Sequence, residues 1–240
     1  MSGSERAPAQ FGLAFQPLRD LATGRVVAAE ALLRWVHPRL GPQPALPTVE
    51  MAERSGLMPA LGRVVLDGAL AAARSWPGDV VVHANVSAHE LREPGYVDGV
   101  HALLARHRVA PGRLLLELTE SALATGPDSV VPVLEDLVAT GVRLGLDDFG
   151  TGWSSIAQLR ASPVDTVKVD RSLTAGIGSS PEEFELVRAV LALVEAAGRE
   201  VVAEGVEDAV QLAHLRALGC RVGQGHHLGR PQPARALIVD

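Results

Sequence analysis

The chain alternates short apolar runs with longer amphipathic runs along most of its 240 residues. The short runs, rich in apolar and β-branched residues, predict strands, and apolar residues at helical spacing predict helices between them. Strands that alternate with helices over a whole chain are typical of a parallel sheet covered by helices. About eight strands in a chain of this length favour a closed (β/α)₈ barrel, and an open doubly wound sheet is the alternative.

The predicted elements can be placed by residue number. The predicted strands are 13–18, 25–35, 80–87, 114–120, 142–149, 166–170, 200–206 and 221–228. The predicted helices are 59–74, 95–107, 128–139, 182–197 and 208–218. The helix over 182–197 has the clearest start, because Ser180 suits the N-cap, Pro181 the first turn and Glu183 the capping-box position. Gly219 is a typical C-terminal cap for the last helix.

Composition limits the class of protein. We expect residues 1–10, which are small and polar, to be a flexible tail or remnant, and residues 11–240 to form one domain. A net charge of −6 argues against a general nucleic-acid surface, which would be basic. Apolar runs stay shorter than the ~20 residues of a membrane span, and the N-terminus lacks the apolar segment of a secretory signal. The sequence therefore predicts a cytoplasmic protein without membrane contact by this chain.

Polar residues recur at one end of the predicted strands. In a (β/α)₈ barrel the carboxyl ends of the strands form one mouth, where side chains from distant parts of the chain meet. A single polar residue there is more commonly a strand terminus or a helix cap, but the recurrence predicts a shared site. The residues in question are Glu30, Asn85, Glu117, Asp147, Asp148, Lys168, Glu204 and Gln224.

The chemistry of these residues favours hard cations. Glu30, Asn85, Glu117 and Asp147 offer only oxygen ligands, which suit Mg²⁺ or Mn²⁺ better than zinc. Asp148 and Glu204 could complete a second cation site beside the first. Two cations about 3.5–4 Å apart can clamp the attacking and leaving oxygens of a phosphoryl displacement. The set therefore predicts metal-assisted phosphodiester hydrolysis with two cations per active site.

The adjacent aspartates in VRLGLDDFGTGWSS, residues 142–155, need a break in strand geometry. Consecutive side chains of a regular strand point to opposite faces, so Asp147 and Asp148 would normally diverge. Gly150 and Gly152 allow the backbone to leave the strand, so that both carboxylates can converge on a cation.

Two basic residues are further candidates. Lys168 could stabilise the nucleophile or the charge on the phosphate, and an ion pair with a neighbouring acid is an equal alternative. Arg34 follows Glu30 at i+4 and could contact a phosphate oxygen, or it could simply be a solvated surface residue.

These motifs together resemble the EAL-domain family of cyclic di-GMP phosphodiesterases. The resemblance covers Phe11 to Pro231. It implies a modified barrel whose first strand is antiparallel to the others, and the opening of cyclic di-GMP to linear pGpG. The matching motifs are FQP at 15–17, EALLRW at 30–35, NVS at 85–87, ELTE at 117–120, DDFGTGWSS at 147–155, KVDRS at 168–172, AEGVE at 203–207 and QGHHLGRP at 224–231.

The resemblance also implies a role for each residue. Ligands of one cation would be Glu30, Asn85, Glu117 and Asp147, while Asp148 serves a second. Glu204 would bind or activate the hydrolytic water with help from Lys168, and Gln224 would form a hydrogen bond near it. Glu120 would hold the DDFGTG loop in its productive position. Gln16 and Arg34 match positions that contact the substrate.

The sequence is compatible with three functions. The chain could be an active phosphodiesterase, a catalytically silent receptor for cyclic di-GMP, or a protein-interaction module. Crowded carboxylates repel one another unless a cation is present, which favours hydrolysis. The resemblance also implies that the chain can form a homodimer next to the DDFGTG loop, where Ile156 and Leu159 allow a contact or belong to the core. A stand-alone enzyme and a piece of a longer sensory regulator are both open.

Overall fold

The structure is a computed structural model that describes residues 10–119, 127–151 and 156–237. Nine strands in these ranges form one sheet, in the order β1-β9-β8-β7-β6-β5-β4-β2-β3. The strands are β1 (Phe11–Asp20), β2 (Val26–His37), β3 (Gly41–Gln43), β4 (Val81–Asn85), β5 (Leu114–Thr119), β6 (Arg143–Phe149), β7 (Thr166–Val169), β8 (Glu200–Ala203) and β9 (Val222–Gln224).

A pairing between β1 and β2 closes eight of these strands into a barrel, and β3 extends β2 beyond it. Strand β1 is antiparallel to both of its neighbours in the barrel, β2 and β9. The remaining barrel pairs, from β2 through β4 to β9, are parallel. The predicted (β/α)₈ barrel with one antiparallel strand is therefore confirmed, and the open sheet is excluded.

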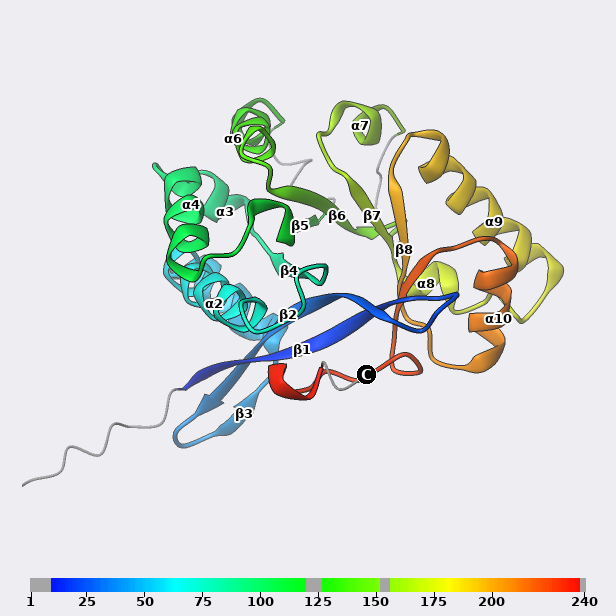
Figure 1. The fold of residues 1–240 in the computed structure, drawn as a ribbon, viewed down its shortest axis with the longest axis horizontal. Coiled ribbons are helices and arrows are strands. Elements are labelled where there is room, and N and C mark those ends of the chain that lie inside the picture. Colours follow the sequence, from blue (N-terminus) through cyan, green and yellow to red (C-terminus); the bar gives the residue numbers. More distant parts are fainter. Residues whose placement is uncertain (1–9, 120–126, 152–155, 238–240) are drawn as a thin grey trace, which may run out of the picture.

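Helices cover the outside of the barrel, as Figure 1 shows. All five predicted helices are present, as α2 (Met58–Ala73), α4 (Tyr96–His107), α6 (Pro127–Ala139), α9 (Pro181–Ala196) and α10 (Ala209–Ala217). The structure adds short helices that the periodicity did not predict, namely α1 (Ala45–Arg54), α3 (Ala88–Leu91), α7 (Ile156–Ala161), α8 (Arg171–Thr174), η1 (Pro111–Arg113) and η2 (Ala234–Ala236). No helix in the described ranges is long and apolar enough to cross a membrane.

The predicted helix ends also hold. Ser180 caps α9, because its side chain accepts a hydrogen bond from the backbone N–H of Glu183. Gly219 follows α10 with a φ of 80°, the left-handed conformation that favours glycine at a helix C-terminus. Capping residues and helical spacing together therefore located these helices.

The strands separate two apolar regions. One face of each strand packs against the helices, and this outer core includes Val82 and Ala84 of β4. Alternate residues point into the barrel, where Leu18, Ala28 and Val202 form a small apolar cluster. Leu159 is 1% exposed and belongs to the outer core, so it is a packing residue and not an exposed dimer contact.

Candidate active site

Lys168 lies at the centre of the polar residues that the sequence places at the strand ends. Its side chain is 1% exposed. The Nζ atom lies 3.3 Å from Glu30 Oε2, 3.2 Å from Glu117 Oε1, 3.1 Å from Asp147 Oδ1 and 2.7 Å from Glu204 Oε1. The barrel thus brings together residues from β2, β5, β6, β7 and the end of β8. Lys168 therefore forms the ion pairs that the sequence left open as an alternative to a catalytic role.

Two amides hold Glu30 in this cluster. Asn85 Nδ2 donates a 2.9 Å hydrogen bond to Glu30 Oε1, and Gln224 Nε2 donates a 2.8 Å hydrogen bond to Glu30 Oε2. The resemblance places Gln224 near Glu204, but its hydrogen-bond partner is Glu30. Both oxygens of the Glu30 carboxylate therefore have defined neighbours.

Asp147 and Asp148 converge because the backbone leaves the strand between them. Ligand atoms of Asp147, Asp148 and Glu204 all lie within 4.8 Å of one another. Asp148 has a φ of 57°, and the β6–β7 register shifts between Leu146 and Phe149. Gly150 follows with a φ of 102°. The break thus begins at Asp148 itself, since aspartate tolerates the left-handed region better than most side chains. Gly152 lies outside the described residues.

Burial and mutual charge control the titration of this cluster. Burial raises the pKa of Glu204 to about 8, although Lys168 acts in the opposite direction. Burial also raises the pKa of Glu117 well above its ordinary value. Burial alone would lower the pKa of Lys168, but the surrounding carboxylates raise it instead. For Glu30, Lys168 and the two amides outweigh burial and lower the pKa. One ammonium therefore does not neutralise all the carboxylates.

The cluster has the donor atoms that a hard divalent cation needs. Among the described residues, Glu117 Oε2 and Gln224 Oε1 are buried without a hydrogen-bond partner, and Asp147 Oδ1 has only its ion pair with Lys168. Buried polar atoms are usually paired, so these oxygens mark a place where a ligand fits. Carboxylate and amide oxygens are the ligands that Mg²⁺ and Mn²⁺ prefer.

The remaining predicted residues lie around this cluster or outside the described chain. Gln16 pairs with Glu30 in the β1–β2 register, and its Nε2 donates a 3.2 Å hydrogen bond to Gly229 O. Arg34 is exposed four residues beyond Glu30 on β2, and its Nη1 donates to Leu33 O. Neither side chain touches Lys168 in the structure. Glu120 lies outside the described residues.

His83 is a site residue that the sequence reasoning missed. Its Nδ1 lies 2.7 Å from Glu117 Oε1, and the residue is 4% exposed. Burial, with the charge of Lys168, lowers the pKa of His83 to about 3, so the ring is neutral at pH 7. The available signal was strand alternation, because His83 lies two residues before Asn85 and shares its face.

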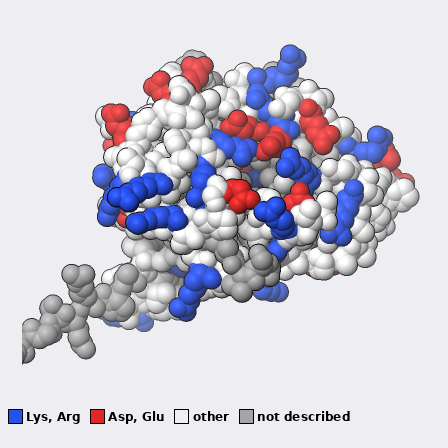
Figure 2. Space-filling model, in the orientation of Figure 1, with Lys and Arg blue, Asp and Glu red and all other residues white. Residues whose placement is uncertain are grey.

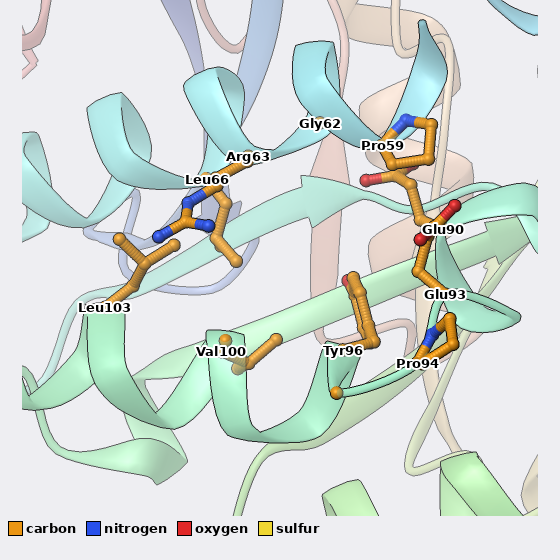
Figure 3. A pocket seen from close by; sticks show the side chains of 12 residues that line it. Pro59, Gly62, Arg63, Leu66, Glu90, Glu93, Pro94, Tyr96, Val100 and Leu103 are labelled. Carbon is orange, nitrogen blue, oxygen red and sulfur yellow. The ribbon is translucent and has the colours of Figure 1, made fainter. Parts of the chain in front are cut away.

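Two cavities adjoin α2. An apolar groove of about 520 Å³ extends from Asn85 and Thr119 at the barrel mouth to α1 and α2, with Leu33, Leu46 and Leu61 among its walls. A smaller cavity of about 200 Å³ lies outside the barrel between α2 and α4, where Figure 3 shows Glu90 and Tyr96. Of these two cavities, only the groove is lined by a residue of the predicted site, Asn85. The face of the molecule drawn in Figure 2 carries both acidic and basic side chains.

Comparisons with known proteins agree with this geometry. The EAL domain family model matches residues 5–231. The bifunctional diguanylate cyclase/cyclic di-GMP phosphodiesterase MucR of Pseudomonas aeruginosa is 38% identical over 96% of this chain and 34% of its own length. The cyclic di-GMP phosphodiesterase NbdA of the same organism is 40% identical over 95% of this chain and 30% of its own length.

A solved structure gives the same result. The PaMucR phosphodiesterase in complex with c-di-GMP superposes with a TM-score of 0.89 at 37% identity, over 95% of this chain and 94% of that one. The chain spans about a third of the length of the two curated relatives. From the family match over almost its whole length, and from the barrel with its acidic mouth, the chain belongs to the EAL domain family.

Proposed function

We propose that this chain is a cation-dependent phosphodiesterase that hydrolyses cyclic di-GMP to linear pGpG. The observation that carries the proposal is the excess of carboxylates around the Lys168 ammonium, with buried oxygens that lack hydrogen-bond partners. The names of MucR and NbdA support the choice of cyclic di-GMP as the substrate. The acidic cluster supports hydrolysis over simple nucleotide binding, because such crowding costs free energy without a cation.

The residues that would hold the cations are those that the family resemblance implies. Glu30, Asn85, Glu117 and Asp147 would hold one Mg²⁺ or Mn²⁺ ion, and Asp148 with Glu204 would hold a second. Their donor atoms are all oxygens, as hard cations require. Such ions, when bound, supply positive charge to the phosphate and lower the pKa of water.

Glu204 would act as the general base for the attacking water. Its Oε1 is held 2.7 Å from Lys168 Nζ, so Oε2 is the atom that would orient the water, and it would accept the proton in the ionised form that bound cations favour. Lys168 would keep Glu204 in place and offer positive charge to the phosphate as negative charge develops there. Gln224 would act indirectly, because its hydrogen bond holds Glu30.

The other predicted residues would bind the nucleotide or the loop. Arg34 is exposed beyond Glu30 on the same face of β2, where its guanidinium can reach a phosphate. Gln16 is beside Glu30 across the β1–β2 pair. Glu120 would hold the loop that follows β6. The apolar groove that begins at Asn85 has walls suited to the flat face of a guanine base.

Substitution of Glu204 tests this function. We expect Glu204→Ala to abolish the formation of pGpG, measured by chromatography with Mg²⁺ or Mn²⁺ present, while cyclic di-GMP still binds in a calorimeter. The matched control is Glu200→Ala at the opposite end of β8, where the carboxylate forms an ion pair with Arg143. This control should keep the wild-type rate. Nucleotide binding without any product from the wild-type chain would instead identify a receptor, and unchanged turnover in Glu204→Ala would remove Glu204 from the mechanism.

A further inference from the structure

We propose that His83 is a positioning residue that fixes the Glu117 carboxylate for cation binding. This proposal rests on the proposed function, because it assigns Glu117 as a cation ligand. His83 itself would touch neither the cation nor the nucleotide. Its ring would hold one oxygen of Glu117 and leave the other oxygen directed at the cation.

The geometry of the pair supports this role. His83 Nδ1 lies 2.7 Å from Glu117 Oε1, and the two side chains are 5% and 0% exposed. Glu117 Oε2 has no hydrogen-bond partner among the described residues. The two oxygens of this carboxylate therefore have different roles, one already bonded and one available.

The direction of the hydrogen bond follows from the role of Glu117 as a cation ligand. An ammonium can only donate, and Lys168 Nζ lies 3.2 Å from the same oxygen. The proposal requires Glu117 to be an ionised carboxylate, which can only accept, so it assigns His83 Nδ1 as the donor to Glu117 Oε1. Imidazole rings that donate to a metal-binding group fix its orientation in many metal sites.

Glu117 is restrained by packing and by two polar contacts. In the sheet it lies between Asn85 of β4 and Gly145 of β6. A Cβ at Gly145 would lie 2.7 Å from Leu115 Cδ2 and 3.6 Å from Glu117 Cγ, so the Leu115 side chain fills the space that the glycine leaves. The polar contacts at the carboxylate come from His83 of β4 and Lys168 of β7.

A cavity lies on the side of the His83 ring away from Glu117. His83 and Leu115 line a cavity of about 560 Å³ that opens at the amino ends of the strands, together with Val81 and Thr166. The ring therefore lies between the carboxylates at the carboxyl ends of the strands and this cavity at their amino ends. An apolar side chain of similar size can fill the same place, which makes a clean substitution possible.

Asparagine and leucine form the matched pair for the test. The Nδ2 atom of asparagine occupies nearly the same place as the Nδ1 atom of histidine and can donate a hydrogen bond. Leucine has nearly the same shape as asparagine but carries no donor. We expect His83→Leu to weaken Mn²⁺ binding about 10–100-fold by calorimetry without nucleotide, the usual effect of removing such a support. His83→Asn should bind Mn²⁺ within about threefold of the wild type. Thermal unfolding of the cation-free variants checks that both fold.

The outcomes separate this proposal from the proposed function. Equal Mn²⁺ affinity in His83→Leu and wild type, or a failure of His83→Asn to restore the affinity, would overturn the role of the hydrogen bond. Loss of Mn²⁺ binding in the wild type itself would instead overturn the cation site and the proposed function. Turnover of cyclic di-GMP is measured separately, so a silent but cation-binding chain still supports the role of His83.

A second measurement does not depend on His83→Leu. Nitrogen NMR of the wild-type imidazoles, with the His83 signal assigned from its loss in His83→Asn, should show a ring protonated at Nδ1. A ring protonated at Nε2 alone cannot donate to Glu117 and would overturn the proposal. If His83→Leu does not fold, this tautomer and the affinity of His83→Asn decide the question.

Discussion

The four carboxylates around Lys168 make this ammonium a structural cation when no metal ion is bound. We expect Lys168→Met, measured by urea unfolding in EDTA, to lower the free energy of unfolding by about 3–5 kcal/mol, because it leaves buried carboxylates without their partner. Added Mn²⁺ should recover part of this loss, since it replaces positive charge.

The control for this prediction is an exposed ion pair. Arg25 Nη2 lies 3.0 Å from Asp79 Oδ2, and both side chains are largely exposed. Arg25→Met should change the free energy of unfolding by less than about 1 kcal/mol. A loss in Lys168→Met no larger than in this control would contradict the structural role of the ammonium.

At the scale of single residues, the sequence predicted which side chains gather at the barrel mouth better than it predicted their contacts with one another. Strand alternation and the shared mouth of a barrel were enough to bring together Glu30, Glu117, Asp147, Lys168 and Glu204. They could not predict that Lys168 reaches four carboxylates, or that His83 supports Glu117, because these contacts depend on depth in the barrel and on side-chain rotamers.

The end of β6 depends on a glycine. Gly150 has a φ of 102°, and a Cβ there would lie 2.2 Å from Leu173 Cδ1. We expect Gly150→Ala to lower the free energy of unfolding by about 1–3 kcal/mol, because both the backbone and the packing are strained. It should also weaken Mn²⁺ binding, since it displaces Asp147 and Asp148.

Gly12→Ala is the control, because a Cβ at Gly12 would have no atom within 4 Å. Urea unfolding and calorimetry with Mn²⁺ measure both variants. If Gly150→Ala matches Gly12→Ala in both measurements, the backbone at Gly150 does not set the position of the aspartates.

The capping box of α3 gives the protein a pH-dependent element. Ser87 N and Ser87 Oγ each donate a 2.9 Å hydrogen bond to Glu90 Oε2. Burial raises the pKa of Glu90 from 4.5 to about 7, so the native state holds this proton more tightly than the unfolded state. As pH rises through this window, Glu90 ionises in a buried place and native stability falls.

Glu90→Gln removes this titration and keeps an acceptor for Ser87. Its stability relative to wild type should therefore increase from pH 5 to pH 8, by about 1–3 kcal/mol in urea unfolding. Glu93→Gln, an exposed carboxyl three residues further along the chain, is the control and should show no such trend. If the difference in the free energy of unfolding between Glu90→Gln and wild type did not change with pH, the raised pKa of Glu90 would be contradicted.

Among the elements, length and capping decided what could be predicted. Long periodic helices such as α9 were located from apolar spacing and their caps. Helix α1 was missed because prolines at positions 42, 44 and 47, around its start, are typical of a loop. Helix α3 is four residues long, too short for a periodic signal, although the S-x-x-E spacing of Ser87 and Glu90 could have indicated its start.

For the chain as a whole, the number and alternation of strands predicted a closed barrel, but not which strands pair to close it. The antiparallel direction of β1 follows from the family resemblance, because periodicity carries no information on strand direction. The structure shows how closure occurs: β1 lies between β2 and β9 and is antiparallel to both. This arrangement places Gln16 beside Glu30 at the mouth.

The central claim is that divalent cations at this mouth make the chain a cyclic di-GMP phosphodiesterase. The direct test is the rate of pGpG formation by the chelator-treated wild-type chain as free Mn²⁺ is increased. We expect no product without the cation and a saturable rise in rate as Mn²⁺ is added. Product formation that persists after complete chelation, or no product at any Mn²⁺ concentration while cyclic di-GMP is bound, would contradict it.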